Sequence, residues 1–191
     1  MSRRIVYVHG FNSSPASAKA RVLRERLERL GRGGEFLCPA LPHRPAEAAR
    51  VLEAAVAGVE PSHLTLLGSS LGGFYATWFA ERSGCRAVLV NPAVRPWELF
   101  AGYLGPQQNL YTGEEYVLTP RHIEELRGLE VEPVTRPERY LLLLGSADEV
   151  LDYRRAVEKY RCAVQVVVQG GDHGFGAFAD YLDLILDFAA A

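Results

Sequence analysis

Residues 63–74 read HLTLLGSSLGGF, and this stretch decides the fold. Its first half is an apolar run that predicts a buried strand, and residues 71–83 carry aromatic side chains at helical spacing. Between them lies Gly68-Ser69-Ser70-Leu71-Gly72, which matches the pattern Gly-x-Ser-x-Gly. In that pattern the serine sits on a strained strand-to-helix turn, where larger neighbours would collide with adjacent backbone. The sequence therefore predicts Ser70 as a nucleophile at the carboxyl edge of a sheet, whereas Ser69 occupies the wrong place in the pattern.

The chain on both sides of this stretch alternates short apolar runs with longer helix-like segments. Such alternation is typical of an α/β protein, in which helices cover both faces of a mostly parallel sheet. Six runs are predicted as strands: Ile5–Val8, Phe36–Cys38, Leu64–Gly68, Ala87–Asn91, Tyr140–Leu144 and Val164–Val168. Five segments are predicted as flanking helices: Ala16–Leu30 with Ser14 as its N-cap, Pro45–Ala57, Leu71–Ser83, Val150–Tyr160 and Phe175–Ala189. If the first strand lies between the second and the third, the strand order reverses there, and ligands of open α/β sheets bind at such a reversal.

The composition is that of an ordinary globular chain. Of 191 residues, 48% are hydrophobic and 23% are charged, and 21 Lys and Arg against 23 Asp and Glu give a formal net charge of −2. This length fits one domain, 1–191, and the near-neutral charge disfavours nucleic acid as a partner. The apolar runs are far shorter than the ~20 residues of a membrane span, and no signal peptide is recognised. The three scattered cysteines fit neither a zinc site nor a redox motif. We expect a cytoplasmic protein.

One segment, Pro92–Arg139, breaks the alternation because it is much longer than an ordinary connection between two strands. Within it, Thr119 and Pro120 begin a predicted short helix that ends near Leu126. Long insertions in compact domains usually serve function, so a lid over a site is predicted. A structural flap that fills a groove is the alternative.

A nucleophilic serine needs an acid and a histidine, which follow it in that chain order in this class of fold. Asp148 stands just past the predicted strand 140–144, and His173 stands just past the predicted strand 164–168. Because all three residues follow strands of one parallel sheet, they can converge at its edge. The imidazole would take the serine proton and return it to the leaving group, while the carboxylate would fix the imidazole tautomer. We predict a triad of Ser70, Asp148 and His173.

Other acids and histidines compete for these roles. Glu149 is expected to point away from the site, Asp152 is expected to be helical already, and Asp172 is expected to order its own loop. Three histidines have no acid or hydroxyl in a comparable setting: His43, His63 and His122. Of these, His43 and His122 are expected on exposed loops. Contact of His43 and His122 with substrate is the alternative.

An oxyanion that forms during attack on an acyl group needs hydrogen-bond donors. His9-Gly10-Phe11 directly follows the first predicted strand, where this class of fold supplies one backbone N–H, and the residue after the nucleophile supplies another. Phe11 and Leu71 are therefore the predicted donors, through their backbones only. His9 is expected to order this loop as a hydrogen-bond donor, and a role as catalytic base is the alternative.

Taken together, these motifs resemble the YqiA-type bacterial esterases, which are small α/β-hydrolases. The resemblance covers almost the whole chain, at Tyr7–Ser14, Cys38–Pro42, Gly68–Ala76, Asn91–Val94, Tyr111–Gly113, Leu118–Pro120, Gly145–Tyr153 and Gly171–Phe175. It implies a minimal α/β-hydrolase fold and a cytoplasmic serine esterase for short acyl esters, with acyl-CoA thioesters as an open second substrate class. Ser70, Asp148 and His173 match the triad positions of that family.

Aromatic side chains of the insertion are candidates for substrate contacts. Four of them are predicted to form an apolar wall beside Phe11: Trp97, Phe100, Tyr103 and Tyr111. Each methylene buried there would contribute up to ~0.8 kcal/mol, and a chain of this size should build a shallow pocket that prefers short acyl groups. The leaving group of an acyl-CoA would lie outside this pocket, near Arg95 or Arg121.

Two other classes of function are alternatives. A catalytically idle hydrolase fold would act as a binding or scaffold protein, although an intact triad argues against it. A flavodoxin-like nucleotide-binding module would need a glycine-rich phosphate loop after the first strand, where His9-Gly10-Phe11-Asn12 stands instead. The sequence therefore favours a serine hydrolase of small-molecule esters that needs neither metal nor cofactor, and it leaves the oligomeric state open.

Overall fold

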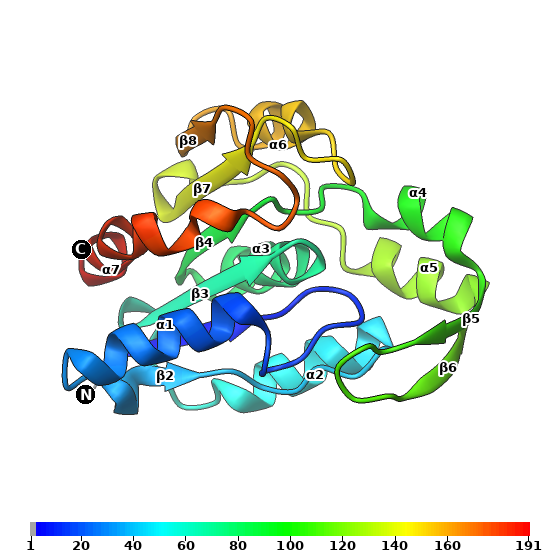
Figure 1. Ribbon diagram of the computed structural model, residues 1–191, viewed down its shortest axis with the longest axis horizontal. Helices are drawn as coiled ribbons and strands as arrows, with labels where there is room; N and C mark the ends of the chain where they lie inside the picture. Colours follow the sequence, from blue (N-terminus) through cyan, green and yellow to red (C-terminus); the bar gives the residue numbers. More distant parts are fainter. Residues whose placement is uncertain (1–2) are drawn as a thin grey trace.

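The computed structural model describes residues 3–191 and is built around a six-stranded sheet (Figure 1). The strands are β1 (Arg4–Val8), β2 (Phe36–Leu37), β3 (Leu64–Ser69), β4 (Arg86–Val90), β7 (Tyr140–Gly145) and β8 (Val164–Val168). Their order is β2-β1-β3-β4-β7-β8, and every pairing in this sheet is parallel. All six predicted strands and the parallel sheet are confirmed. Because β1 lies between β2 and β3, the strand order reverses at β1 as expected.

Helices cover both faces of the sheet because its strands present apolar side chains to both sides (Figure 1). One face carries α1 (Ala18–Arg29) and α7 (Leu182–Ala190), and the other carries α2 (Pro45–Ala55), α3 (Leu71–Ser83) and α6 (Tyr153–Lys159). Alternate strand residues point to opposite faces. In β1, for example, Ile5 packs with α1 and α7, whereas Val6 packs with α2 and α3. No helix between residues 3 and 191 is long and apolar enough to cross a membrane.

Three helices begin later than predicted. The helix predicted from Phe175 becomes α7 only at Leu182, because Phe175 has a left-handed φ of +51° and the 3₁₀ helix Gly176–Tyr181 follows it. In α1 and α6, nearby side chains form turns first. Ser14 accepts a hydrogen bond from the N–H of Ala16 (3.1 Å), so it stabilises a turn and is not the N-cap of α1. Asp152 accepts a hydrogen bond from the N–H of Arg154 (3.1 Å) and is the N-cap of α6, which corrects its expected helical position. Short 3₁₀ helices lie at Gly33–Glu35, Pro61–His63, Ala101–Tyr103, Pro137–Arg139 and Gly176–Tyr181.

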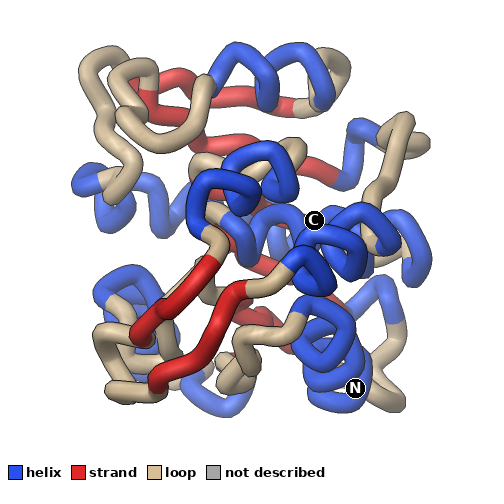
Figure 2. Tube along the Cα trace, turned by 90° about the vertical axis from the view of Figure 1, so that its right-hand side faces the viewer, coloured by secondary structure: helices blue, strands red, loops and turns tan. Residues whose placement is uncertain are grey.

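The segment between β4 and β7 leaves the sheet and lies beyond the carboxyl ends of the strands (Figure 1). It contains α4 (Pro96–Phe100), the antiparallel hairpin of β5 (Gly105–Gln108) and β6 (Glu115–Leu118), and α5 (Pro120–Gly128). The helix from Pro120 is confirmed and extends to Gly128. The hairpin, whose two strands stand in front of the main sheet in Figure 2, was not predicted. The β5 sequence GPQQ has no β-branched or aromatic residue, so it carries no strand signal.

Candidate active site

Ser70 lies on the turn between β3 and α3. Its φ of +54° and ψ of −121° place it in a backbone conformation that residues with a β-carbon rarely adopt. The backbone around it is closely packed, because a β-carbon at Gly72 would overlap the carbonyl oxygen of Val8 and one at Gly68 would overlap that of Gly72. Only glycine fits at these two positions, which are the two glycines of the Gly-x-Ser-x-Gly pattern. They hold the serine above the carboxyl ends of β1 and β3.

The structure brings the three residues of the predicted triad together. Nε2 of His173 lies 3.1 Å from Oγ of Ser70, and its Nδ1 lies 2.8 Å from Oδ2 and 3.0 Å from Oδ1 of Asp148. The Asp148 side chain is 1% exposed, and that of His173 is 23% exposed. Oδ1 of Asp148 also accepts hydrogen bonds from the N–H groups of Val150 (2.9 Å) and Leu151 (2.8 Å). The carboxylate is therefore held in one orientation toward the imidazole.

The environment of Asp148 determines which atoms of Asp148, His173 and Ser70 carry the protons. Burial of the carboxyl group opposes ionisation, but the hydrogen bonds from His173, Leu151 and Val150 outweigh burial and lower the pKa of Asp148 below its usual value. An ionised carboxylate only accepts hydrogen bonds, so Nδ1 of His173 must donate. In the neutral imidazole, Nε2 is then the acceptor for the Ser70 hydroxyl. This arrangement can remove a proton from Ser70.

The acids that compete with Asp148 occupy other positions. Glu149 does not point away as expected, because its Oε2 accepts a hydrogen bond from the N–H of His173 (3.0 Å). It thus contacts the backbone of the histidine and not its ring. Oδ1 of Asp172 faces the N–H of Gly176 (3.4 Å), which agrees with a role inside its own loop. His63 lies at the amino end of β3, at the opposite end of this strand from Ser70.

The loop after β1 lies against the turn that carries Ser70. Gly10 packs on this turn, since a β-carbon at Gly10 would meet the Ser70 Cβ at 3.3 Å. His9 is buried, and burial lowers its pKa. Its Nε2 accepts the N–H of Leu41 (3.0 Å) and its Nδ1 faces the carbonyl of Gly10 (3.1 Å), so its ring joins two loops. His9 orders this loop as an acceptor as well as a donor, and not as a donor alone.

A pocket of about 170 Å³ opens beside Ser70. It is lined by Phe11, Leu71, Ala93, Pro96, Leu99, Phe100, Tyr103, Val150 and Leu151, together with Ser70 and His173. The lining contains both predicted oxyanion donors, Phe11 and Leu71. It also contains two of the four predicted substrate contacts, Phe100 and Tyr103.

Trp97 and Tyr111 do not line this pocket, which corrects their expected role. Positions 96, 99, 100 and 103 fall on one side of α4 and of the 3₁₀ helix that follows it, so Trp97 faces the other side. There Trp97 packs edge-on against Phe74, with ring centroids 6.1 Å apart, and is buried in the core. Tyr111 lies at the tip of the hairpin and is 54% exposed.

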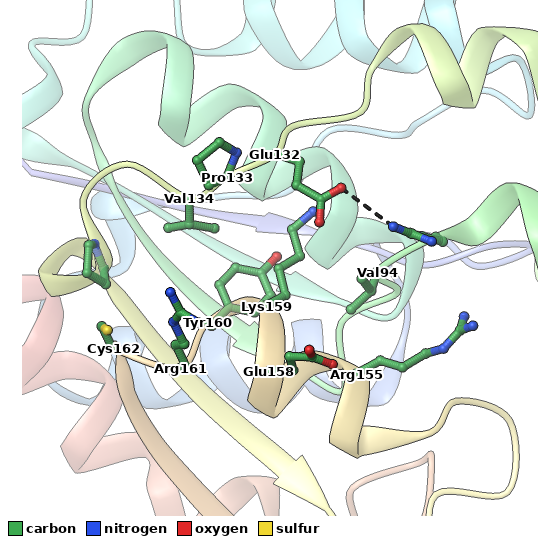
Figure 3. A pocket seen from close by; sticks show the side chains of 12 residues that line it. Val94, Glu132, Pro133, Val134, Arg155, Glu158, Lys159, Tyr160, Arg161 and Cys162 are labelled. Carbon is green, nitrogen blue, oxygen red and sulfur yellow. Dashed lines mark ion pairs between the residues drawn. The ribbon is translucent and has the colours of Figure 1, made fainter.

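A larger hollow adjoins this pocket, and a second hollow adjoins the first, with which it shares Val94, Arg95 and Arg155. The first, of about 300 Å³, shares Leu99, Val150 and Leu151 with it and also carries Arg95 and Arg155. The second, of about 540 Å³, has charged walls around Lys159 and Tyr160, and Glu132 pairs with Arg95 there at 3.7 Å (Figure 3). Arg95 therefore lies in a hollow adjoining the Ser70 pocket.

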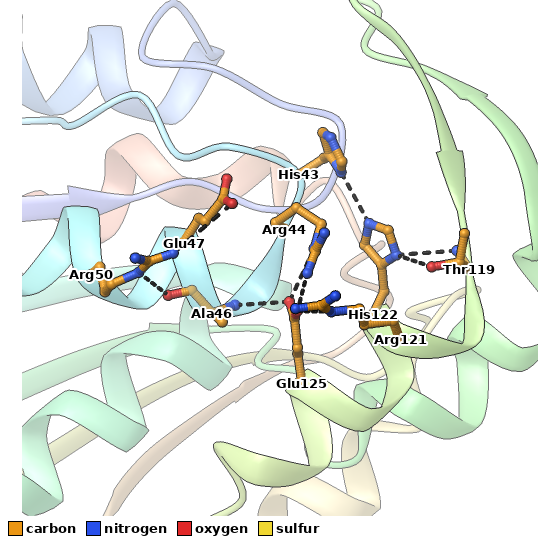
Figure 4. Close-up of polar contacts among 9 residues, drawn as sticks. All are labelled: His43, Arg44, Ala46, Glu47, Arg50, Thr119, Arg121, His122 and Glu125. Atoms are coloured by element: carbon orange, nitrogen blue, oxygen red, sulfur yellow. Dashed lines mark hydrogen bonds and ion pairs between the residues drawn. The ribbon is translucent and has the colours of Figure 1, made fainter.

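Polar contacts hold the insertion against α2 (Figure 4). Glu125 of α5 pairs with Arg44 and accepts the N–H of Ala46 (3.2 Å) at the start of α2. It also pairs with Arg121 (3.3 Å), so Arg121 does not reach the Ser70 pocket. These contacts anchor α5 to α2.

A histidine pair lies beside these contacts. His122 is 3% exposed, with its Nδ1 accepting the N–H of Thr119 (3.1 Å) and its Nε2 lying 3.0 Å from Nδ1 of His43. His43 is half-buried and stacks on Tyr116, with ring centroids 4.1 Å apart. The expectation of exposed loop histidines is wrong for both residues. Burial, followed by the neighbouring His43, lowers the pKa of His122.

The hairpin also contacts the loop after β1. Tyr116 donates its hydroxyl to Oδ1 of Asn12 (2.7 Å), and Asn109 donates to the carbonyl of Ser13 (3.0 Å). Asn12 has a φ of +48°, a left-handed conformation that asparagine tolerates better than most residues. The hairpin thus holds the residue that follows Phe11. Among the described residues, no cluster of three or more His, Cys, Asp or Glu side chains could hold a metal ion.

The fold places this chain in the class of α/β-hydrolase-fold proteins. Alpha/beta hydrolase domain-containing protein 10 from mouse matches it with a TM-score of 0.72 at 18% identity, covering 98% of this chain and 89% of that chain. Est1E from Butyrivibrio proteoclasticus matches with a TM-score of 0.74 at 16% identity, covering 100% of this chain and 89% of that chain. At these identities the likeness shows the fold alone, and it confirms the predicted fold class.

The chain belongs to the Uncharacterised protein family (UPF0227), whose family model matches residues 4–190. A UPF0227 protein of Serratia proteamaculans (strain 568) is 26% identical over 158 residues, which cover 81% of this chain and 80% of that protein. This is the YqiA-type family that the sequence motifs resemble, so the predicted family is confirmed.

Proposed function

We propose that this protein is a serine hydrolase that cleaves carboxylic esters through an acyl-enzyme intermediate. One observation carries the proposal: Ser70 Oγ is hydrogen-bonded to His173, and His173 is hydrogen-bonded to the ionised Asp148. Ser70 and His173 line an apolar pocket. The fold and the family agree with a hydrolase. Neither of them assigns a substrate.

In the proposed reaction, Nε2 of His173 takes the Ser70 proton while Oγ attacks the carbonyl carbon of the ester. The backbone N–H groups of Phe11 and Leu71 would then stabilise the negatively charged oxygen. His173 returns the proton to the leaving alcohol as the C–O bond breaks, and Asp148 stabilises the imidazolium in between. A water molecule, deprotonated by the same nitrogen, then hydrolyses the acyl-serine and restores the hydroxyl.

The size and lining of the pocket support short acyl chains. Its volume of about 170 Å³ is below the ~300–1,000 Å³ of sites that enclose drug-sized ligands, and most of its lining side chains are apolar. Acyl-CoA thioesters are the second candidate class of substrate. The adjoining hollow carries Arg95 and Arg155, but Glu98 in the same hollow pairs with both, at 3.7 and 2.6 Å. An anionic leaving group would therefore have to displace Glu98 from these side chains.

A series of p-nitrophenyl esters from acetyl to dodecanoyl, together with the matching acyl-CoA thioesters, tests this proposal. We expect kcat/KM to be highest for esters of two to six carbons, to be lost in Ser70→Ala and to be retained in Ser69→Ala. A wild-type protein that hydrolyses neither series but binds acyl compounds would instead support an idle hydrolase fold that acts as a binding protein. Hydrolysis that survives in Ser70→Ala would contradict the proposed nucleophile.

A further inference from the structure

Asn91 follows β4 directly and is buried beneath the loops that carry Asp148 and His173. Its backbone N–H donates to the carbonyl of Leu143 (3.0 Å), which continues the pairing of β4 with β7. Its φ of +42° is left-handed, and its exposed fraction is 3%. Asparagine tolerates this backbone conformation better than most residues, and its short amide reaches neighbouring backbone groups. The side chain is thus aimed at the edge of the sheet where the triad lies.

The Asn91 amide makes three hydrogen bonds to two different loops. Its Oδ1 accepts the N–H of Gly145 at 2.7 Å. Its Nδ2 donates to the carbonyl of Asp172 at 2.9 Å and to that of His173 at 3.1 Å. A primary amide has two N–H donors and one carbonyl acceptor, so the hydrogens and the oxygen are all used. No other residue type of this size could replace both the donors and the acceptor.

These contacts join the two loops of the triad. Gly145 ends β7 three residues before Asp148, and a β-carbon at Gly145 would overlap the carbonyl oxygen of Gly171 in the histidine loop. The two loops therefore touch each other directly, and Asn91 binds both from the neighbouring strand. The N–H of His173 is held by Glu149 (3.0 Å) and its carbonyl by Asn91, so side chains fix the peptide groups on both sides of its Cα.

We propose that Asn91 is a positioning residue that sets the separation and orientation of Asp148 and His173. This inference rests on the proposed function only in that the triad performs the chemistry. The side chain of Asn91 hydrogen-bonds to the backbone of these two loops and does not line the pocket. Its backbone neighbours hold Ser70, because the carbonyl of Val90 accepts the N–H of Ser70 (3.0 Å) and the N–H of Ala93 donates to the Ser70 carbonyl (3.1 Å). Misplacing a reacting group by about 1 Å can cost on the order of 100-fold in rate, so we expect loss of the amide to lower kcat by about 10- to 100-fold, with a smaller change in KM.

Asn91→Gly removes the amide and tolerates the left-handed backbone, which makes it the variant of choice. The matched control is Tyr160→Phe, which breaks the buried hydrogen bond (2.7 Å) between Tyr160, directly after α6, and Thr77 of α3. Active sites are counted with a fluorophosphonate, and kcat for p-nitrophenyl butyrate is expressed per labelled site. We expect kcat per site to fall in Asn91→Gly and to stay at the wild-type value in Tyr160→Phe. An unchanged kcat per site in Asn91→Gly would overturn the proposal, because a purely structural role lowers only the number of active molecules.

A spectroscopic measurement separates this inference from the proposed function. The hydrogen-bonded Nδ1–H of His173 should give a far-downfield proton resonance in the wild-type protein, whether or not an ester is hydrolysed. We expect that resonance to shift or to broaden away in Asn91→Gly and to be unchanged in Tyr160→Phe. If Asn91→Gly does not fold, Asn91→Asp keeps the acceptor for Gly145 and is expected to move the resonance in the same way. A resonance that is unchanged in the folded Asn91 variant would overturn the positioning role, whereas failure of wild-type hydrolysis would overturn only the proposed function.

Discussion

The sheet edge that carries the triad and the insertion 92–139 are built in different ways. At the edge, Ser70, Asp148 and His173 each stand within five residues of the end of a strand, and short local sequences place them. The insertion instead depends on contacts between residues that are distant in the chain, such as Tyr116 with Asn12 and Glu125 with Arg44. The comparison teaches that short local sequences bring the proposed catalytic residues to the sheet edge. Their orientation through Asn91, the wall of the pocket and the contacts of the loop after β1 depend instead on residues distant in the chain.

The largest expected effect lies at the edge of the sheet. Asp148→Asn should lower kcat by about 10³- to 10⁴-fold, because the amide cannot stabilise the imidazolium and favours the wrong tautomer of His173. Asp172→Asn should remain within about tenfold of wild type, since the carboxylate of Asp172 accepts its hydrogen bond from Gly176 of its own loop and not from His173. Steady-state kinetics on p-nitrophenyl butyrate measure both. The assignment of the acid would be wrong if Asp172→Asn proved the more damaging change.

Two aromatic residues of α4 should separate packing from substrate contact. Trp97→Ala removes a buried side chain from the core and is expected to lower the free energy of unfolding by about 3–5 kcal/mol. It should leave the preference among acyl chain lengths unchanged in the folded protein. Phe100→Leu keeps most of the volume, so it should cost less stability but change that preference, because Phe100 lines the pocket. Urea denaturation and kcat/KM across the ester series report the two effects. The reverse pattern would place Trp97 at the substrate.

Loss of a hydrogen bond between the hairpin and the loop after β1, which carries the proposed oxyanion donor Phe11, should have a moderate effect. Tyr116→Phe removes the hydrogen bond to Asn12, and an ordinary hydrogen bond contributes about 1 kcal/mol, which corresponds to about fivefold in kcat/KM if it is fully expressed in the transition state. Tyr111→Phe, at the exposed tip of the same hairpin, is the control and should match wild type. Equal activity of both variants would show that the insertion does not support the site through this contact.

The smallest effect concerns the pH dependence of stability. The hydrogen bond from Arg44, opposed by burial and aided by the N–H of Ala46, lowers the pKa of Glu125 to about 2. A carboxyl group whose pKa is depressed in the folded state stabilises the protein above its unfolded pKa of about 4.3, and this contribution is lost as the pH falls toward 2. The Tm of wild type should therefore exceed that of Glu125→Gln at pH 7, and the difference should shrink between pH 5 and 2. A difference in Tm that is independent of pH would contradict this account.

The sequence predicted the sheet and the convergence of the triad because both follow from short patterns. Buried parallel strands read as continuous apolar runs, and strand ends at one edge bring Ser70, Asp148 and His173 together. The hairpin gave no such signal, because Gly105–Gln108 lacks strand-forming residues and is fixed by distant partners. The starts of α1 and α6 differ from the prediction because Ser14 and Asp152 stabilise turns there.

The wall of the pocket was only partly predictable. Aromatic residues of the insertion were obvious candidates, but helical geometry turns Trp97 toward the core while Leu99 faces the pocket. Spacing along α4, at positions 96, 99, 100 and 103, is the signal that could have selected the correct face. Val150 and Leu151 had no such signal, since they lie on a loop that the hydrogen bonds of Asp148 place at the pocket.

Covalent labelling tests the central claim most directly. Wild-type protein is treated with a fluorophosphonate, and the modified residue is located by peptide mass spectrometry. The account predicts one adduct, on Ser70, that is retained in Ser69→Ala and strongly slowed in Asp148→Asn. An adduct on another residue, or labelling that persists in Ser70→Ala, would contradict it.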